Sequence, residues 1–272
     1  MNQSASILYI PHGGGPLPLM DHGGHTALVS FLQQIPDQLI RPKEILVISA
    51  HWERDIPVIT ANPSPELIYD YFGFPEQAYK IDYPVPGAPD LAEKIYTLLT
   101  QARIKSKLDP ARGLDHGVFV PLKLMVPKAD IPCIQLSLTA DLDPSSHLAI
   151  GRALSPLCRE NILILGSGFS FHNMHAFGKS TLNPKDTDPE NEAFQNWLIE
   201  TCTDPALNPS QVEERLIHWE NAPHARYCHP REEHLLPLHV CAGIAGYKSA
   251  TTVFQDTVLG KKTLAFLWQE AQ

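Results

Sequence analysis

The sequence predicts an α/β fold: one domain over residues 1–272, with a central mixed, largely parallel sheet flanked by helices. Short apolar runs such as residues 45–50, ILVISA, are continuous, which is typical of strands covered on both faces. Segments with helical spacing lie between these runs, and this alternation is expected of an α/β sheet. No internal repeat or low-complexity linker interrupts the chain, which favours a single domain.

The strand pattern begins near the N-terminus and returns at the C-terminus. The predicted strands are residues 7–10, 43–51, 131–138 and 161–168, followed by an alternating two-stranded antiparallel stretch at 251–269. The first strand breaks at Pro11 into a glycine-rich loop. The second ends on small residues and then His51, Trp52 and Glu53, where a turn residue would be usual. This choice of residues directs attention to chemistry at that end of the strand.

Helical segments are predicted at residues 25–35, 90–102, 147–157, 188–202, 212–221 and 233–246. Asp90 is expected to cap the second of these helices. Asp188 is the expected cap of the fourth, with Pro189 at its first helical position. Residues 55–90 are rich in proline and aromatic side chains and are expected to form a long loop, which in compact domains is often functional.

Composition disfavours several classes of partner and location. The formal net charge is −9, which disfavours nucleic acid and anionic membranes. No uncharged apolar stretch approaches the ~20 residues that span a bilayer, and the N-terminus lacks the pattern of a signal peptide. The 5 cysteines are scattered without a CxxC pair, as expected for free thiols in a reducing cytosol. A cytoplasmic location is therefore expected, and the oligomeric state is left open.

Histidine is abundant, with 13 in the chain, and three of these residues follow predicted strands. His12 follows the first strand, His51 ends the second, and His172 comes after residues 161–168 through a glycine-bearing loop. Ligands of open α/β sheets bind outside the carboxyl ends of the strands. These three histidines are therefore expected to converge on one cleft.

The remaining histidines allow more than one interpretation. His116 lies in a tight loop between Gly113 and Gly117, where it is either a turn residue or a functional one. The stretch HARYCHPREEHLLPLH holds four histidines, and residues five apart cannot share one face of a helix. At most a few of these four can belong to one site, and His224 and His239 are expected to be surface or core residues.

The chemistry that suits such a set is metal binding. Neutral imidazole is a ligand of Zn²⁺ and Fe²⁺. Three protein ligands that leave coordination positions open make a catalytic metal site, and further histidines near it can transfer protons near neutral pH. No HExxH motif is present, so that type of protease site is excluded. The sequence thus predicts a metal site at the carboxyl ends of the strands.

Four segments, PHGGGP, SAHWE, GLDHGVFVPL and HPREEHLLPL, resemble the class III extradiol ring-cleaving dioxygenases, and most closely the 4,5-DOPA dioxygenase-like branch. The aromatic segment YDYFGFPEQAYKIDYPVPGAP and the segment GSGFSFHN resemble the same branch, so the similarity runs from about residue 7 to 245. The resemblance implies a small-molecule catechol substrate, DOPA-like, whose ring is opened beside its two hydroxyls with O₂ to a semialdehyde.

The resemblance also assigns residues. It implies that His12, His51 and His234 bind the metal, with Fe²⁺ required for activity and Zn²⁺ able to occupy the same site. The wider family usually has a glutamate at the third position, so His234 is a departure that this branch shares. The resemblance makes His172 the acid–base residue and His116 a second pocket histidine that contacts substrate, and it places His229 near the substrate.

Two alternatives stay open at the level of sequence. A zinc-dependent hydrolase could use the same three histidines with His172 as its base, and a non-catalytic homologue could keep the scaffold for binding. A nucleotide-binding module and a serine hydrolase fit less well, because GSGFSF lacks both the third glycine of GxGxxG and the second glycine of GxSxG.

Overall fold

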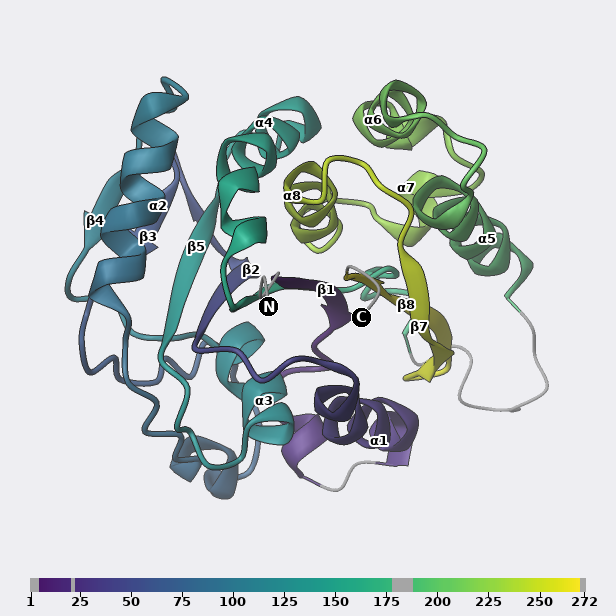
Figure 1. Ribbon diagram of the computed structural model, residues 1–272. Coiled ribbons are helices and arrows are strands. Elements are labelled where there is room, and N and C mark those ends of the chain that lie inside the picture. Colours follow the sequence, from purple (N-terminus) through teal and green to yellow (C-terminus); the bar gives the residue numbers. More distant parts are fainter. Residues whose placement is uncertain (1–4, 21–22, 178–187, 270–272) are drawn as a thin grey trace.

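An eight-stranded sheet runs through the part of the chain that the computed structural model describes, residues 5–20, 23–177 and 188–269 (Figure 1). The strand order across the sheet is β4-β3-β5-β2-β6-β1-β8-β7. The strands are β1 (Ser6–Pro11), β2 (Glu44–Arg54), β3 (Val58–Thr60), β4 (Lys107–Asp109), β5 (Cys133–Thr139), β6 (Ile162–Gly168), β7 (Thr251–Val258) and β8 (Lys261–Trp268).

The centre of the sheet is parallel and its flanks bring in antiparallel pairs. β6 pairs in parallel with both β1 and β2, and β2 pairs in parallel with β5. β8 is antiparallel to β1 and to β7, and β3 is antiparallel to β5. The predicted mixed, largely parallel sheet is confirmed, as is the antiparallel pair at the C-terminus.

Helices cover both faces of the sheet (Figure 1). On one side lie α2, α4 and α8, with α5, α6 and α7 beyond α8, and on the other side lie α1 and α3. The helices are α1 (Thr26–Gln34), α2 (Pro89–Gln101), α3 (His116–Met125), α4 (Pro144–Leu154), α5 (Pro189–Thr203), α6 (Pro209–Ile217), α7 (Ala225–Cys228) and α8 (Leu236–Ile244). Short 3₁₀ turns occur at Leu17–Leu19, Gly23–His25, Ile35–Gln38, Glu76–Lys80, Ser155–Arg159 and Trp219–Asn221.

The continuous apolar runs follow from this two-sided cover. Successive side chains of a strand point to opposite faces. In β2, Leu46 and Ile48 pack into the cluster beneath α2, α4 and α8, while Ile45 and Val47 pack into the cluster beneath α1 and α3. Both faces therefore bury apolar side chains, and no polar position is left for the alternation of a half-exposed strand.

Two predictions around helix starts are wrong. Asp90 is not the cap of α2, because the helix begins at Pro89 and Ala88 is the N-cap residue. Proline is pre-organised for the first helical position, which moves the start one residue earlier. His116 begins α3 instead of occupying a tight loop. The loop predicted at 55–90 also holds β3 and the 3₁₀ turn Glu76–Lys80.

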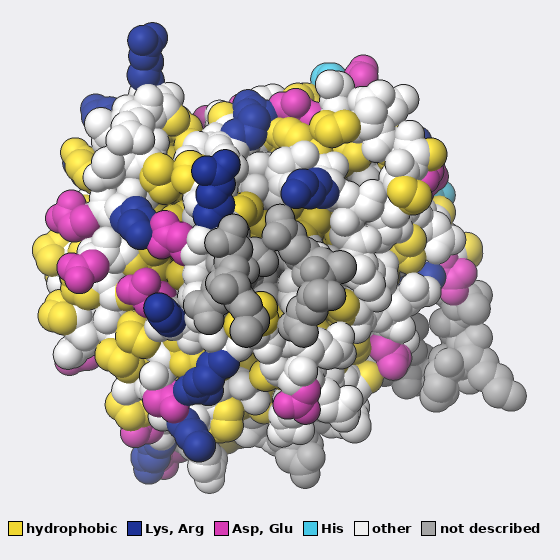
Figure 2. Space-filling view, in the orientation of Figure 1, with side chains coloured by type: hydrophobic (Ala, Val, Ile, Leu, Met, Phe, Trp, Pro, Cys, Tyr) yellow, Lys and Arg dark blue, Asp and Glu magenta, His cyan; other side chains and the backbone are white. Residues whose placement is uncertain are grey.

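The described residues also show the character of the helices, the surface charges and the thiols. No helix in the described ranges is long and apolar enough to cross a membrane. On the face drawn in Figure 2, Lys and Arg side chains are interspersed with Asp and Glu side chains. Four of the five cysteines, Cys133, Cys202, Cys228 and Cys241, are buried and carry free thiols.

Candidate metal centre and active site

His12 lies at the carboxyl end of β1. Its backbone N–H donates to the carbonyl of Gly168 (3.1 Å), which extends the β1–β6 pairing beyond the strand. Its side chain is buried at 1% exposure. Because β1, β6 and β2 are mutually parallel, their carboxyl ends meet at the same edge of the sheet. His12 therefore stands where two other strands also deliver side chains.

His51 lies in a bulge of β2. β2 pairs with β5 at Ile48–Leu136 and again at Glu53–Leu138, so four residues of β2 stand opposite one residue of β5. Bulges re-aim side chains and are frequent beside active sites. The prediction that β2 ends at His51 is wrong, because pairing resumes after the bulge, and it is the bulge that turns the imidazole toward the sheet edge.

His234 lies in the turn before α8. The helix begins at Leu236, later than predicted, because the proline after Leu236 favours the first turn of a helix. The carbonyl of His234 accepts hydrogen bonds from the Phe169 N–H (2.9 Å) and the Tyr9 hydroxyl (3.1 Å). A Cβ at Gly168 would lie 2.1 Å from the same carbonyl, so only glycine permits this close approach. The turn is thus held against the ends of β6 and β1.

The structure brings the three predicted metal ligands together. One ligand atom from each of His12, His51 and His234 lies within 4.8 Å of the other two. The Nε2 atoms of His12 and His51 are 2.9 Å apart. The ring centroid of His234 lies 5.2 Å from that of His12 and 4.9 Å from that of His51. Three distant parts of the chain therefore surround one small volume with imidazole nitrogens.

A hydroxyl fixes the tautomer of His12. The Ser167 hydroxyl donates to the carbonyl of Gly117, so its oxygen is available as an acceptor. His12 Nδ1 lies 3.1 Å from this oxygen and donates to it. The proton of His12 therefore sits on Nδ1, and Nε2 presents a lone pair to the cluster, as in metal-bound histidines whose other nitrogen donates to the protein.

Glu233 links His234 to His172. His234 Nδ1 donates to Glu233 Oε1 (2.9 Å), and His172 Nδ1 lies 3.2 Å from the same oxygen. The two imidazoles stack with their centroids 3.4 Å apart and their planes 18° apart. One carboxylate thus orients a ring of the trio and a ring outside it, and the Nε2 atom of each is left for other partners.

Asp70 makes the corresponding link between His51 and His116. Asp70 Oδ1 accepts from His116 Nδ1 (2.8 Å) and from the His116 backbone N–H (2.9 Å). Its other oxygen lies 3.8 Å from His51 Nδ1. The His51 and His116 ring centroids are 3.9 Å apart. His172 and His116, the two predicted pocket histidines, are therefore each tied by a carboxylate to a ring of the trio.

The electrostatics keep the trio neutral and the two carboxylates charged. Burial, reinforced by the neighbouring imidazoles, holds the pKa values of His12 and His234 well below the ordinary value and lowers the pKa of His51 to about 3. Burial raises the pKa values of Asp70 and Glu233, but hydrogen bonds from His116 and His172 outweigh it, so both pKa values lie below normal. Neutral imidazoles backed by carboxylates are the form that binds a divalent metal.

The donor set fits a divalent cation. With the Nδ1 protons of His12 and His234 placed by Ser167 and Glu233, lone pairs converge from neutral rings. The His12 and His51 Nε2 atoms are at hydrogen-bond distance, 2.9 Å, and a divalent cation bound by both rings would take the place of the proton between them. Three nitrogen ligands suit Zn²⁺ and Fe²⁺, and they leave coordination positions for other molecules.

A cavity of about 430 Å³ opens over the cluster. All five of the histidines described so far line it, together with Asp70 and the glycine-rich loop after His12. Its other described walls are apolar or aromatic: Leu17, Tyr71, Phe72, Phe74, Phe169, Met174, Phe177 and Leu259. A concave apolar site with a few converging polar groups is the form typical of small-molecule sites.

The comparison with known families assigns the chain. Residues 7–266 match the family described as the catalytic LigB subunit of aromatic ring-opening dioxygenase. The chain belongs to the LigB family. This membership confirms the resemblance found in the sequence motifs, and it implies a dioxygenase that acts on a small molecule with O₂.

Relatives of this LigB-family chain include named dioxygenases. It is 39% identical to the 4,5-DOPA dioxygenase extradiol of Beta vulgaris, over 92% of this chain and 90% of that one. It is also 39% identical to the dioxygenase tasH of Hapsidospora irregularis, over 97% of this chain and 85% of that one. A crystal structure of an uncharacterized Escherichia coli K12 protein superposes with a TM-score of 0.78 at 27% identity, covering 97% of this chain and 99% of that chain.

Sequence reasoning missed the two carboxylates of the LigB-family site. Asp70 stands inside the aromatic segment that was expected to be a functional loop, where an acidic residue between two tyrosines is the available signal. Glu233 directly precedes His234, and this adjacency is its signal in the sequence. Neither residue follows a strand or a helical period, so their partners become visible only once the chain is folded.

His229 does not reach the cavity. Its side chain is fully buried, with Phe194 and Trp219 at ring-centroid distances of 5.5 and 5.9 Å. Its Nε2–H donates to the carbonyl of Ser170 (2.9 Å). This position does not support the expected contact with substrate, because apolar rings and the backbone enclose the imidazole. Its sequence distance from His234 gave no indication of this.

The burial of His229 should make the stability of the protein depend on pH. Burial lowers its pKa to about 3, whereas an unfolded chain binds this proton below about pH 6.5. The free energy of unfolding therefore falls as the pH drops from about 6.5 toward about 3. We expect His229→Gln to flatten this dependence by about 1.4 kcal/mol per pH unit between about pH 6 and pH 4. Urea denaturation at several pH values measures the slope, the exposed His224→Gln is the control, and an unchanged slope in H229Q would contradict the assignment.

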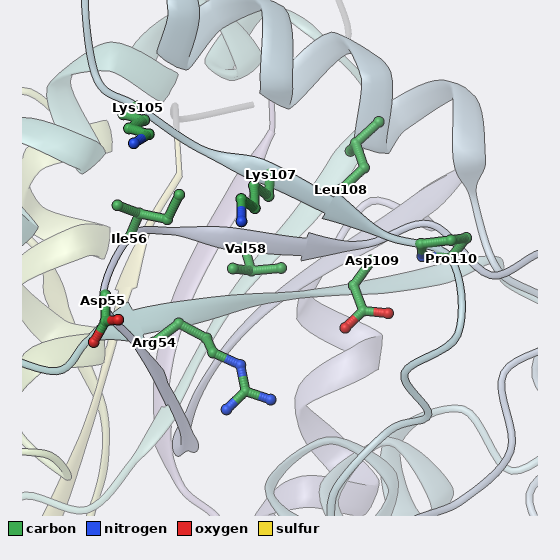
Figure 3. Close-up of a pocket in the computed structure, with 9 residues that line it drawn as sticks. All are labelled: Arg54, Asp55, Ile56, Val58, Lys105, Lys107, Leu108, Asp109 and Pro110. Carbon is green, nitrogen blue, oxygen red and sulfur yellow. The ribbon is translucent and has the colours of Figure 1, made fainter.

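A second hollow lies away from the histidines, at the β3–β4 edge of the sheet (Figure 3). Figure 3 shows Lys105 and Lys107 above β3 and Arg54 below it. The residues that line it include no histidine or cysteine. We place no chemistry there.

Proposed function

We propose that this LigB-family protein is a non-haem Fe²⁺-dependent extradiol dioxygenase that opens the ring of a catechol with O₂ to give a semialdehyde. The observation that carries the proposal is the trio His12, His51 and His234, whose ligand atoms lie within 4.8 Å of one another at the base of a cavity. The DOPA-like substrates of named relatives and the family's use of O₂ support it. We also propose that the chain acts as one catalytic domain.

The three imidazoles would hold the metal, and an Fe²⁺ ion would supply coordination positions for the catechol oxygens and O₂ and a path for electrons between ring and O₂. Zn²⁺ fits the same nitrogens but has no redox chemistry. We therefore expect activity to require Fe²⁺, whereas either metal can bind.

His172 is the proposed proton carrier. Glu233 holds its Nδ1 side at 3.2 Å, which leaves Nε2 to accept a proton from a catechol hydroxyl and to return it as the ring opens. His116, whose Nδ1 donates to Asp70, offers its Nε2 side to an oxygen of substrate. The apolar walls of the cavity exclude water, which strengthens these polar interactions.

Replacing Asp70 by Asn should weaken the site without removing a proposed metal ligand. Asp70 accepts two hydrogen bonds from His116 and faces His51, so D70N removes the negative charge that orients and polarises both rings. We expect a loss of about 10- to 100-fold in metal affinity or turnover. Competition with a chromogenic chelator measures the affinity, and the exposed Asp55→Asn is the control. Unchanged values in D70N would remove Asp70 from the site.

The proposed function is tested by loading the protein with Fe²⁺ under anaerobic conditions and adding O₂ with a panel of catechols. We expect O₂ uptake, a yellow ring-opened product whose mass exceeds that of the catechol by one O₂, and no uptake by Zn²⁺-loaded protein. Ester or amide hydrolysis by the Zn²⁺ form, with no O₂ uptake by the Fe²⁺ form, would instead support a zinc hydrolase on the same histidines.

A further inference from the structure

Two apolar side chains stand exposed at the same cavity. Among the described residues, Phe72 is 92% exposed and Met174 is 68% exposed, and both line the cavity over the histidines. The third large exposed apolar side chain, Tyr96 on α2, is 37% exposed and lies elsewhere. Exposed apolar groups that adjoin a site mark a surface for an apolar ligand more often than isolated ones do.

Phe72 is presented by a loop that is fixed on both sides of it. The hydroxyl of Tyr71 donates to the carbonyl of Ala78 (2.5 Å), and the hydroxyl of Tyr69 donates to the carbonyl of Ile81 (2.7 Å). Gly73, with φ +79°, makes the turn directly after Phe72. Tyr71, which is buried, and Tyr69, which is partly buried, anchor the loop while the phenyl ring projects from its tip, so the exposure of Phe72 is built into the loop.

Met174 is presented by a turn that also carries His172. Asn173 Nδ2 donates to the carbonyl of Tyr227 (2.7 Å), and Asn173 Oδ1 accepts from the backbone N–H of His175 (3.1 Å). Met174 therefore stands on a fixed backbone two residues from the proposed proton carrier. Its thioether is flexible and polarisable, which suits contact with ligands of varied shape.

The inner walls continue this apolar surface toward the metal ligands. Phe169, Phe177, Leu17 and Leu259 line the cavity below the rim. The carboxylate in the described lining is Asp70, which already accepts two hydrogen bonds from His116. The charged groups of an amino-acid substituent would meet mainly apolar side chains, and burying a charge without a partner disfavours binding.

The cavity is larger than a catechol needs. A cavity of about 150 Å³ accommodates benzene, whereas this one has about 430 Å³. A ring of that size over the histidines would leave more than half of this volume for other groups, in a cavity that Phe72 and Met174 also line. A substituent on the ring would occupy that space.

We propose that the substrate is a catechol that carries an uncharged, apolar substituent, and that Phe72 and Met174 determine this specificity by contacting the substituent. This inference rests on the proposed function, since it concerns the substrate of the same site. It narrows the substrate class away from catechols with a charged amino-acid side chain, the class named for several relatives.

Anaerobic calorimetry with Zn²⁺-loaded protein tests the inference without turnover. The probes are 4-methylcatechol, 4-butylcatechol and DOPA. Each buried methylene strengthens binding by roughly fourfold. We expect 4-butylcatechol to bind at least about tenfold more tightly than 4-methylcatechol. The expected gain is smaller than three fully buried methylenes would give, because part of the butyl chain stays at the open rim. DOPA should bind more weakly than either. The kcat/KM values of the Fe²⁺-loaded enzyme should follow the same order.

The variants are Phe72→Ser and Met174→Gln, with Tyr96→Ser as the matched control. All three positions are exposed, so folding should be preserved. We expect the Phe72→Ser, Met174→Gln double variant to reduce the butyl-to-methyl ratio to below about threefold. Tyr96→Ser should keep the wild-type ratio.

The outcomes separate this inference from the function on which it rests. If 4-methylcatechol and 4-butylcatechol bind equally, if DOPA binds as tightly as 4-butylcatechol, or if the double variant keeps the wild-type ratio, the specificity assignment is overturned and the proposed dioxygenase stands. If none of the catechols binds or is turned over, the proposed function fails and the specificity assignment fails with it.

Discussion

Replacing His51 by Ala is expected to abolish stoichiometric metal binding. His51 supplies one of three nitrogens that lie within 4.8 Å of one another, and its Nε2 atom lies 2.9 Å from that of His12. Two remaining imidazoles leave a site of much lower affinity, since the missing nitrogen has no replacement held in place by the bulge of β2. Metal content after dialysis against Fe²⁺ or Zn²⁺, measured by atomic absorption, gives the result.

A second group of possible metal ligands lies beside His51, so the experiment needs a control for metal bound there. Asp70 and His116 form a second group of possible ligands with His51, so either could rebind a displaced ion. The double variant His51→Ala, His116→Ala tests this, and the exposed His224→Ala should keep one metal per chain. Circular dichroism checks that each variant is folded. Full occupancy in H51A and in the double variant would refute the proposed ligand set.

The sequence predicts the central strands well because their burial leaves a simple signal. β6 and the first part of β2 are covered on both faces, so continuous apolar runs at residues 45–48 and 162–165 mark them, whereas the polar residues that end β2 hide its true boundary. β3 and β4 have three residues each, too few for a period to emerge. α3 is buried almost throughout and contains Pro121, so neither an amphipathic pattern nor an unbroken run of helix formers marks it.

Some residues of the site could likewise be predicted from the sequence and others could not. Histidines at the carboxyl ends of strands could be expected to converge, because the geometry of a parallel sheet brings those ends together. Asp70 and Glu233 could not be assigned, since each lies in irregular structure and its role depends on a partner that is distant in sequence or outside any period. His229 shows the converse, because only packing against Phe194 and Trp219 separates it from the cavity.

The two carboxylates give the site a common plan. Asp70 joins His51 to His116, and Glu233 joins His234 to His172. In each pair one ring belongs to the proposed metal set and the other lines the cavity. A metal that withdraws electron density from one ring of a pair therefore also changes the hydrogen bond of the shared carboxylate to the other ring. Metal binding and the proposed proton transfer are thus electrostatically connected.

The second large effect is expected from His172→Ala, which should lower turnover by at least ~100-fold, the lower end of the range for general acid–base catalysis. His172 stacks on His234 and is held by Glu233 through Nδ1, but it is not part of the trio, so metal content should stay near one per chain. The exposed His175→Ala, in the same turn, is the matched control and should retain wild-type turnover.

Loss of metal in H172A would indicate a structural role through Glu233 and His234. His172→Gln separates the two roles, because an amide can keep the contact with Glu233 without carrying a proton; metal binding should then be retained while turnover stays low. Full turnover in H172A would remove His172 from the mechanism.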